Sequence, residues 1–481
     1  MRVLVLQLTR FGDVLQTIPV LSALQRKYPN AEIDLLARKK YSAAAKIFQY
    51  ANVIDFESDY FLKPAFENDD YSEDQFWQSI HHLESFCDNL AFRNYDLILN
   101  LSYSPMSSYM THYISNGDTS RVRGYSRHAD GFLNISDDTS AYFYGQVGVN
   151  RPNRFHVIDL FTSVVEVNLI DEDYRIPFVL KNPMMHDNYA VLHVGASHER
   201  KRVPSAKWNQ ICRELVKNNV HVVFIGTESE KELIESCAAG MNAEDFTCLA
   251  GKTKMEELFA LIKGASFYLG GDSGPLHICN FTDTHCYNLS NKEVNFWETG
   301  PKSKYSRVWY EDNFATLDAR ELVENILRDR HGQESLFIKG SKFSGYLVKN
   351  EPFEWKLILA LYTGQDFPSA DHPYIIQAFL QLNEVNEIIL HQLQTYRDGN
   401  NEQYSIIQTA EQIMQEIARE CVEVAPLVDW LTTEKIRVGP TNTDSILNQY
   451  KEIHFKMKRI ASLYIGEEWQ KSEGSHGQDR V

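Results

Sequence analysis

The sequence predicts an α/β protein with two Rossmann-like domains facing a cleft, followed by a bundle of α-helices. Three observations support this. A strand–helix–strand pattern opens the chain at residues 3–37, a second series of strand–helix units begins near Tyr189, and amphipathic helices replace this alternation after about residue 334. We therefore expect domains at residues 1–180, 181–333 and 334–481.

Composition limits the class of protein. The chain has 481 residues, of which 43% are hydrophobic and 23% charged, as in soluble proteins with more than one core. A net charge of −17 disfavours nucleic acid as a partner. The seven cysteines show no CxxC spacing, and we find neither a signal peptide nor an apolar run of membrane-spanning length. We expect a cytoplasmic protein without disulfides.

The first strand, Val3–Leu8, is apolar throughout, which is typical of a parallel strand buried on both faces. A turn at Thr9–Asp13 leads into a helix, and Pro19 marks either a kink or the true helix start. Asp13 has two interpretations: a helix N-cap, or a carboxylate at the carboxyl end of a strand, where a general base can act. Residues 57–92 are expected to form a helical or lid-like insertion.

The second α/β series places small residues after several strands. Gly195–Ser197 follows the strand Ala190–Val194, Gly226 ends the strand His221–Ile225, and Gly251 precedes a helix. The strand Ala265–Leu269 leads into Gly271-Asp272-Ser273-Gly274-Pro275-Leu276-His277. Backbone amides at such a strand–helix junction bind anions, and glycines let a ligand approach closely. The alternative is a tight turn with a helix cap.

The region after residue 334 has the apolar spacing of three amphipathic helices. Their apolar positions are Ile375, Phe379, Leu382, Ile389, Leu393 and Tyr396, then Ile406, Ala410, Ile413, Ile417 and Cys421, then Ile446, Tyr450, Ile453, Met457 and Ile460. Asn386 fills a gap in the first series, where it either sets the helix register or oligomer state or lies exposed. We expect this bundle to serve assembly or docking.

Five segments together resemble the ADP-heptose:lipopolysaccharide heptosyltransferases, glycosyltransferase family nine, which have the GT-B fold. They are Val3–Leu8 with Phe11–Pro19, Arg123–Tyr125, Leu192–Ser197 with Lys201, Pro204 and Trp208, Leu249–Thr253 with Leu258 and Ala265, and Asp272–His277. The resemblance covers residues 1–330. Residues 278–283 depart from the family pattern, which leaves the nucleotide sugar open, and the strand ending at Ser102 lacks the usual Asp-rich end, which leaves the acceptor open.

The resemblance implies inverting, metal-independent transfer of a heptose or related sugar from a nucleoside diphosphate, ADP-heptose by analogy, to a lipopolysaccharide core or other cell-surface glycan. The first domain would hold the acceptor and the second the donor, with Asp318–Arg330 crossing back to the first. Asp13 would be the general base and Lys201 would stabilise the leaving group. The expected donor-binding residues are Gly12, Ser197, Gly226, Gly251, Asp272, Ser273, Gly274 and His277. His277 is also compatible with a packed polar residue.

The expected acceptor-binding residues are Arg123 and Arg127, whose guanidiniums could hold an anionic group. Their alternative is a solvated surface. Asp171-Glu172-Asp173 matches the DxD of metal-dependent sugar transferases, but it lies in an acidic linker, and we expect it to be solvent-exposed without a metal. We expect no metal site and no cofactor besides the nucleotide sugar.

The expected partners are a nucleotide sugar and an anionic or lipid-linked glycan, with peripheral contact to the inner face of the inner membrane and homo-oligomers through the C-terminal helices. Three alternatives stay open: a GT-B enzyme with a protein acceptor, a sugar-nucleotide epimerase, and a non-catalytic sugar-nucleotide-binding scaffold. A Rossmann oxidoreductase is disfavoured because no GxGxxG follows any strand.

Overall fold

The computed structural model describes residues 1–465 except 67–70, 185, 342–344, 347–350 and 398–399, and these residues form two units. The first unit contains Met1–Arg123, Gly148–Asn150 and Arg154–Lys349, and the second contains Gly124–Val147, Arg151–Asn153 and Asn350–Val481. The second unit therefore combines a segment from the N-terminal third of the chain with the helices at its end.

The first sheet is built around β1 (Arg2–Gln7), which lies between β2 (Glu32–Arg38) and β4 (Leu97–Asn100) and is parallel to both. β3 (Asn52–Phe56) pairs with β2, also in parallel. Residues 3–6 are buried, as the unbroken apolar run predicts. This arrangement confirms the first Rossmann-like sheet.

Helix α1 (Phe11–Lys27) follows β1 and begins at Phe11, so Pro19 lies inside the helix and the expectation that it marks the helix start is wrong. The insertion predicted over residues 57–92 is helical, as α3 and α4. The other helices of this half are α2 (Ala43–Phe48), α3 (Ser58–Phe66), α4 (Glu73–Phe92), α5 (Pro105–Ile114) and α7 (Val157–Val165).

The second sheet has the strand order β14-β13-β12-β11-β10-β7-β8-β9. The strands from β7 to β12 are parallel to their neighbours, and β13 and β14 are antiparallel at one end. They are β7 (Tyr189–His193), β8 (His221–Phe224), β9 (Phe246–Cys248), β10 (Phe267–Gly271), β11 (Cys286–Ser290), β12 (Ser306–Tyr310), β13 (Ile338–Ser341) and β14 (Gly345–Tyr346). The sheet thus continues beyond residue 334, where we expected the helical extension to begin.

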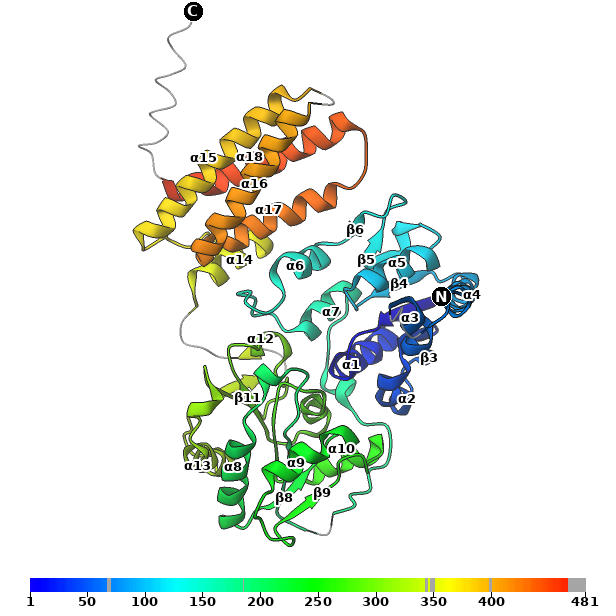
Figure 1. The fold of residues 1–481 in the computed structure, drawn as a ribbon, viewed down its shortest axis with the longest axis vertical. Coiled ribbons are helices and arrows are strands. Elements are labelled where there is room, and N and C mark those ends of the chain that lie inside the picture. The colour runs from blue at the N-terminus through cyan, green and yellow to red at the C-terminus, as the bar shows by residue number, and fades with distance from the viewer. Residues whose placement is uncertain (67–70, 185, 342–344, 347–350, 398–399, 466–481) are drawn as a thin grey trace, which may run out of the picture. The chain divides into compact units, whose positions relative to one another are not determined.

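Helices cover this sheet (Figure 1): α8 (Ser205–Lys217), α9 (Lys231–Cys237), α10 (Met255–Gly264), α11 (Cys279–Thr282), α12 (Phe296–Thr299) and α13 (Ala319–Arg330). Trp208 and Leu215 of α8 share one buried cluster with Leu322 and Ile326 of α13. The expectation that Asp318–Arg330 crosses back to the first domain is therefore wrong: its apolar face packs against α8 of the second sheet.

β5 (Val122–Arg127) and β6 (Leu133–Ile135) continue the first sheet beyond β4, and in their hairpin Tyr125 pairs with Ile135. From Gly124 on, this hairpin and α6 (Asp138–Gln146) belong to the second unit. Its C-terminal helices are α14 (Phe353–Thr363), α15 (Pro373–Thr395), α16 (Asn401–Glu420), α17 (Ala425–Val438) and α18 (Thr443–Ile465). The three predicted helices are confirmed as α15, α16 and α18, whereas α14 and α17 escaped the periodicity analysis. The predicted apolar face of α16 is wrong in part: Ile406 and Ile413 are exposed, and the buried residues are Ile407, Ala410, Met414 and Ala418.

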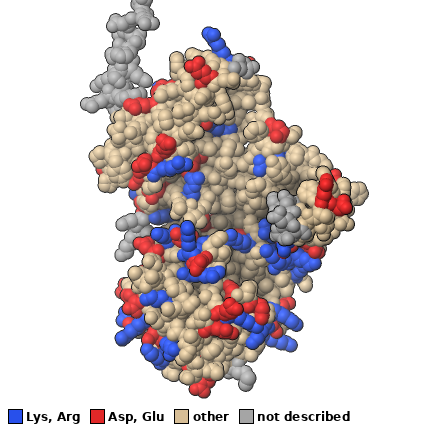
Figure 2. Space-filling view, viewed as in Figure 1, with Lys and Arg blue, Asp and Glu red and all other residues tan. Residues whose placement is uncertain are grey.

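On the face shown in Figure 2, basic and acidic side chains are interspersed, and wide areas carry neither. In the described part of the chain, no helix has both the length and the apolar character needed to span a bilayer. Both sheets and the helical C-terminal region agree with the predicted α/β class.

Candidate active site

The first part of the site is the N-terminus of α1, at the carboxyl end of β1. Asp13 is the third residue of this helix, and its Oδ2 atom accepts a hydrogen bond from the backbone N–H of Arg10 at 3.0 Å. The carboxylate thus ties the helix start from the third position, while Arg10 occupies the N-cap. The N-cap interpretation of Asp13 is wrong in its position, although the side chain does satisfy a backbone donor at this end.

The environment of Asp13 changes its acidity. Burial raises the pKa of the Asp13 carboxyl above its usual range, and the nearby Asp272 carboxylate adds to the rise. Hydrogen bonds from Arg10 and Thr9 and the Arg10 charge oppose it without cancelling it. A carboxylate whose pKa is raised towards the working pH is a better general base.

The second part of the site follows β10. The Lys201 Nζ atom lies 2.9 Å from the Asp272 Oδ2 atom, and the Thr299 hydroxyl donates to Asp272 Oδ1 at 3.0 Å. The Lys201 and Asp272 side chains are only 15% and 13% exposed. Lys201 therefore neutralises a largely buried carboxylate that lies near Asp13.

Ser273 is held by a chain of side chains from the neighbouring strands. The His193 Nδ1 atom lies 2.9 Å from the Ser273 hydroxyl, and the His193 Nε2 atom lies 3.5 Å from Glu230 Oε1. Burial raises the pKa of Glu230. Hydrogen bonds from His193 and Thr227, together with the charge of His193, outweigh this effect and lower the pKa to about 2. The ionised Glu230 orients the imidazole, which in turn orients the Ser273 hydroxyl.

The N-terminus of α1 and the loop after β10 approach each other closely at two glycines, Gly12 and Gly274. A Cβ on Gly12 would lie 3.0 Å from the His277 ring, and a Cβ on Gly274 would overlap the Phe11 ring. The Arg10 guanidinium also donates to the Ser197 hydroxyl at 3.2 Å. Leu15 and Ile18 of α1 share a buried cluster with Leu276. The structure thus brings Gly12, Asp13, Ser197, Asp272, Gly274 and His277 together.

His277 is buried, and its burial lowers its pKa to about 4 despite the opposing charge of Asp272. Its imidazole is therefore neutral at pH 7. Its Nδ1 atom has no hydrogen-bond partner among the described residues. Both interpretations of His277, packing and ligand contact, remain compatible with this position.

Gly226 and Gly251 lie beyond the neighbouring strands β8 and β9, where the Gly251 N–H donates to the Gly226 carbonyl at 2.9 Å. Gly251 has φ +70°, a conformation that favours glycine. A Cβ on Gly226 would lie 2.9 Å from Glu230 Oε2, so this glycine leaves room for the carboxylate that holds His193. These two residues shape the loops next to Ser273.

The two predicted acceptor arginines lie four residues apart on β5, within which the boundary between the two units falls. Arg123 lies in the first unit, where its guanidinium is 2.5 Å from the Glu166 carboxylate and donates to the Val164 carbonyl. Arg127 lies in the second unit and donates to the Gly131 carbonyl at 3.1 Å. Neither is simply a solvated surface charge.

The expectation that Asp171–Asp173 is solvent-exposed is wrong for Asp173, which is 1% exposed. It accepts hydrogen bonds from Ser22 and Arg26, both on α1. Its carboxylate is thus engaged in anchoring the linker to the first helix.

Sequence reasoning missed several residues of this region. Lys302, 3% exposed, lies 2.5 Å from the Asp159 carboxylate of α7, and the His156 Nε2 atom lies 2.9 Å from the Gly300 carbonyl. Burial and the nearby Lys302 lower the pKa of His156. Thr299 and Glu230 were also missed. Of these residues, only Glu230 could have been predicted to lie at the site, because it stands four residues after Gly226 at the start of a helix.

Comparisons with known proteins indicate a glycosyltransferase. The sequence model of glycosyltransferase family 9 (heptosyltransferase) matches residues 84–286. Lipopolysaccharide heptosyltransferase 3 of Escherichia coli (strain K12) is 26% identical over 285 residues, which are 58% of this chain and 79% of that protein. A second Escherichia coli lipopolysaccharide heptosyltransferase 3 is 25% identical and covers 66% of this chain and 90% of its own length.

Solved structures share the fold. The family 9 glycosyltransferase of Veillonella parvula DSM 2008 superposes with a TM-score of 0.54 at 15% identity, over 69% of this chain and 97% of its own. The Escherichia coli heptosyltransferase WaaC with ADP superposes with a TM-score of 0.51 at 16% identity, over 69% of this chain and all of its own.

The fold is that of the GT-B class, and the sequence matches indicate a glycosyltransferase. Within that class, residues 84–286 match the model of glycosyltransferase family 9, and the chain is similar to heptosyltransferases.

Proposed function

We propose that the chain transfers a heptose from ADP-heptose to a hydroxyl of a lipopolysaccharide core or related cell-surface glycan, with inversion and without a metal ion. The observation that carries this proposal is the meeting of Asp13, from the first sheet, with Asp272 and Lys201, from the second. The names of the relatives support the choice of sugar and acceptor.

In the proposed reaction, Asp13 removes the proton from the acceptor hydroxyl as its oxygen bonds to the anomeric carbon of the sugar. The bond from that carbon to the diphosphate oxygen breaks, and ADP leaves from the opposite face. The raised pKa of Asp13 suits a group that must take up a proton during the step.

Negative charge develops on the leaving diphosphate. We assign the stabilisation of this charge to the Lys201 ammonium and to the backbone N–H groups of Ser273 and Gly274. Lys201 is paired with Asp272, and the Ser273 hydroxyl is held by His193. These contacts keep the donor-binding groups in place before the nucleotide sugar arrives.

The test is to incubate the full chain with ADP-heptose and a heptose-accepting lipopolysaccharide core. ADP release and a product heavier by one heptose residue are expected. NMR of the new glycosidic bond reports the anomeric configuration. Release of ADP without a glycosylated product, or transfer with retention, would contradict the proposal.

A further inference from the structure

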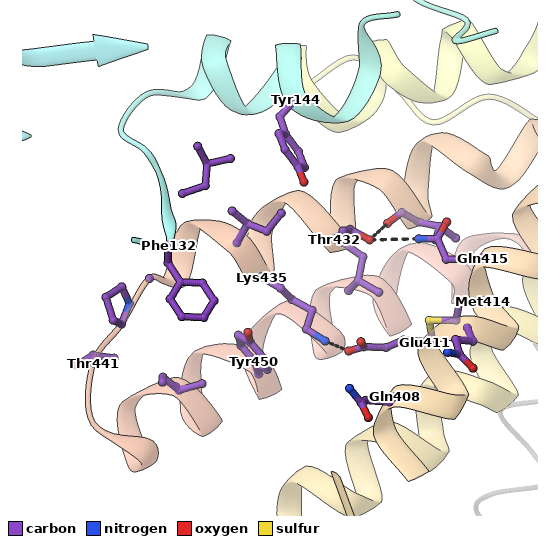
Figure 3. Close-up of a pocket in the computed structure, with 18 of the residues that line it drawn as sticks. Phe132, Tyr144, Gln408, Glu411, Met414, Gln415, Thr432, Lys435, Thr441 and Tyr450 are labelled. Carbon is purple, nitrogen blue, oxygen red and sulfur yellow. Dashed lines mark hydrogen bonds and ion pairs between the residues drawn. The ribbon is translucent and has the colours of Figure 1, made fainter. Parts of the chain in front are cut away.

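The second unit contains a cavity of about 1310 Å³ that the proposed transfer chemistry does not use (Figure 3). It lies between α16, α17, the start of α18 and the β5–β6 hairpin with α6, and every residue lining it belongs to the second unit. Ligand sites for small molecules usually measure about 300–1,000 Å³. The cavity therefore has room for a ligand of several sugar rings.

The cavity has an apolar floor and an aromatic rim. Met414, Val428 and Leu431 are buried beneath it as part of the helical core. At the rim, the Phe132 and Tyr144 side chains are 70% and 40% exposed. Exposed rings beside an apolar floor provide flat surfaces on which a ligand with apolar faces can stack.

The walls carry polar groups that both donate and accept hydrogen bonds. Gln408, Gln412 and Gln415 lie on α16, and Thr432 faces them from α17. Gln415 donates to the Thr432 hydroxyl at 3.3 Å, which links the two helices. An amide side chain offers two donors and a carbonyl acceptor, which matches hydroxyl groups on a ligand.

Charges around the cavity are balanced. The lining cations are Arg127, Arg419 and Lys435, and the lining anions are Asp130, Glu411 and Glu416. The Lys435 ammonium is ion-paired with Glu411 and lies 4.7 Å from the centre of the Tyr450 ring (Figure 3). With equal numbers of each sign, this lining favours an uncharged ligand over a diphosphate or a nucleic acid.

We propose that this cavity binds an uncharged oligosaccharide segment of the acceptor glycan. Sugar rings have apolar C–H faces and edges of hydroxyl groups, which fit the aromatic rim and the glutamine walls. The acceptor role rests on the proposed function, and it is favoured because the β5–β6 hairpin belongs to the sequence region we expected to bind the acceptor. The second unit would thus bind the acceptor rather than the donor.

The test is calorimetry on the full chain with a deacylated, dephosphorylated lipopolysaccharide core oligosaccharide, its phosphorylated counterpart, and ADP. Phe132→Ala and Gln412→Ala alter exposed side chains of the cavity, so both variants are expected to fold. Phe92→Ala is the matched control, because Phe92 is 91% exposed and lies in the first unit.

Wild type is expected to bind the dephosphorylated oligosaccharide, and each cavity variant to bind it about three- to tenfold more weakly. Affinity for ADP should stay unchanged in every variant, and Phe92→Ala should bind both probes as wild type does. Binding of only the phosphorylated probe, no oligosaccharide binding, or wild-type affinity in both cavity variants would overturn the proposal. Calorimetry measures binding without turnover, so the two tests are independent. A failed transfer assay would refute the proposed function, whereas the oligosaccharide affinities alone decide whether the cavity binds a glycan.

Discussion

The Lys201 ammonium and the Asp272 carboxylate, 71 residues apart in the chain, form an ion pair of 2.9 Å at the carboxyl edge of the second sheet. Asp272 also raises the pKa of Asp13, which comes from the first sheet. Asp272 is thus paired with Lys201 and still raises the pKa of the candidate base. The site is electrostatically coupled between the two sheets.

Replacing this lysine tests that coupling. Lys201→Met is expected to lower turnover by about 10²–10³-fold if Lys201 stabilises the leaving diphosphate. It should also lower the unfolding free energy by about 1–3 kcal/mol, because Asp272 loses its charged partner. The double variant Lys201→Met/Asp272→Asn should recover part of the stability but not the turnover. Thermal denaturation and ADP release measure the two effects, and wild-type turnover in Lys201→Met would exclude the catalytic role.

Asp13→Asn preserves a carbonyl oxygen for the Arg10 N–H but cannot accept a proton. We expect transfer to slow by about 10²–10⁴-fold while ADP binding is retained. Turnover equal to wild type would leave helix capping as the role of Asp13. Steady-state kinetics and calorimetry with ADP separate the two possibilities.

The pH dependence of transfer follows from the same carboxylate. Because the pKa of Asp13 is raised in the folded state, the base is lost by protonation as the pH falls through a value above the ordinary aspartate pKa of about 3.9. The acid limb of the kcat/KM profile should lie there. The folded state also holds this proton more tightly than the unfolded state, so Asp13 contributes stability at low pH that is lost as the pH rises through the raised pKa. Asp13→Asn should remove this contribution, which pH-dependent unfolding measures.

The close approach of Gly274 to Phe11 makes a steric prediction. Gly274→Ala should push the β10 loop away from α1, since the new Cβ overlaps the Phe11 ring. We expect weaker ADP binding and a lower melting temperature. The double variant Gly274→Ala/Phe11→Ala should recover ADP affinity, because the overlapping ring is gone. If the double variant is no better than the single one, the effect has another origin.

Metal independence is tested directly by assay in excess chelator. Transfer is expected to continue at its full rate, because Lys201 and the loop amides are assigned the charge that a metal would otherwise neutralise. Loss of turnover that magnesium or manganese restores would contradict the proposed mechanism.

In the helical unit, Asn386 and His454 form a reciprocal pair. The His454 Nδ1 atom lies 2.6 Å from Asn386 Oδ1, and Asn386 Nδ2 donates to the His454 carbonyl at 3.0 Å. Asn386→Leu is expected to cost about 1–3 kcal/mol of unfolding free energy by leaving these buried groups unpaired. Asn386→Leu/His454→Leu should cost less. Equal stability of the single variant and wild type in urea would contradict the pairing.

His454 also predicts a pH response of stability. Burial, followed by the Lys435 charge, lowers its pKa to about 3, so the folded protein keeps this imidazole neutral. The stabilisation is present above the ordinary histidine pKa of about 6.5 and is lost as the pH falls from there towards 3, because only the unfolded chain gains the proton. In His454→Leu, this part of the acid sensitivity should disappear from urea titrations at successive pH values.

The sequence alone determined the α/β class, the first βαβ unit and three of the C-terminal helices. It did so because these features are local: an apolar run predicts the buried strand β1, and spacing of three and four predicts α15, α16 and α18. Asn386 stood out for the same reason, as a break in the apolar spacing. Asn386 is buried, so the interpretation that it lies exposed is wrong.

Only the tertiary structure decided which side chains meet. β10 lies beside β7, and β7 beside β8, so Ser273, His193 and Glu230 form one chain although they come from three strand–helix units. Likewise, residues 124–147 group with the C-terminal helices although β5 and β6 continue the first sheet, which the strand pattern gave no reason to expect. Strand order and long-range packing depend on burial shared between distant segments, and no local spacing encodes that choice.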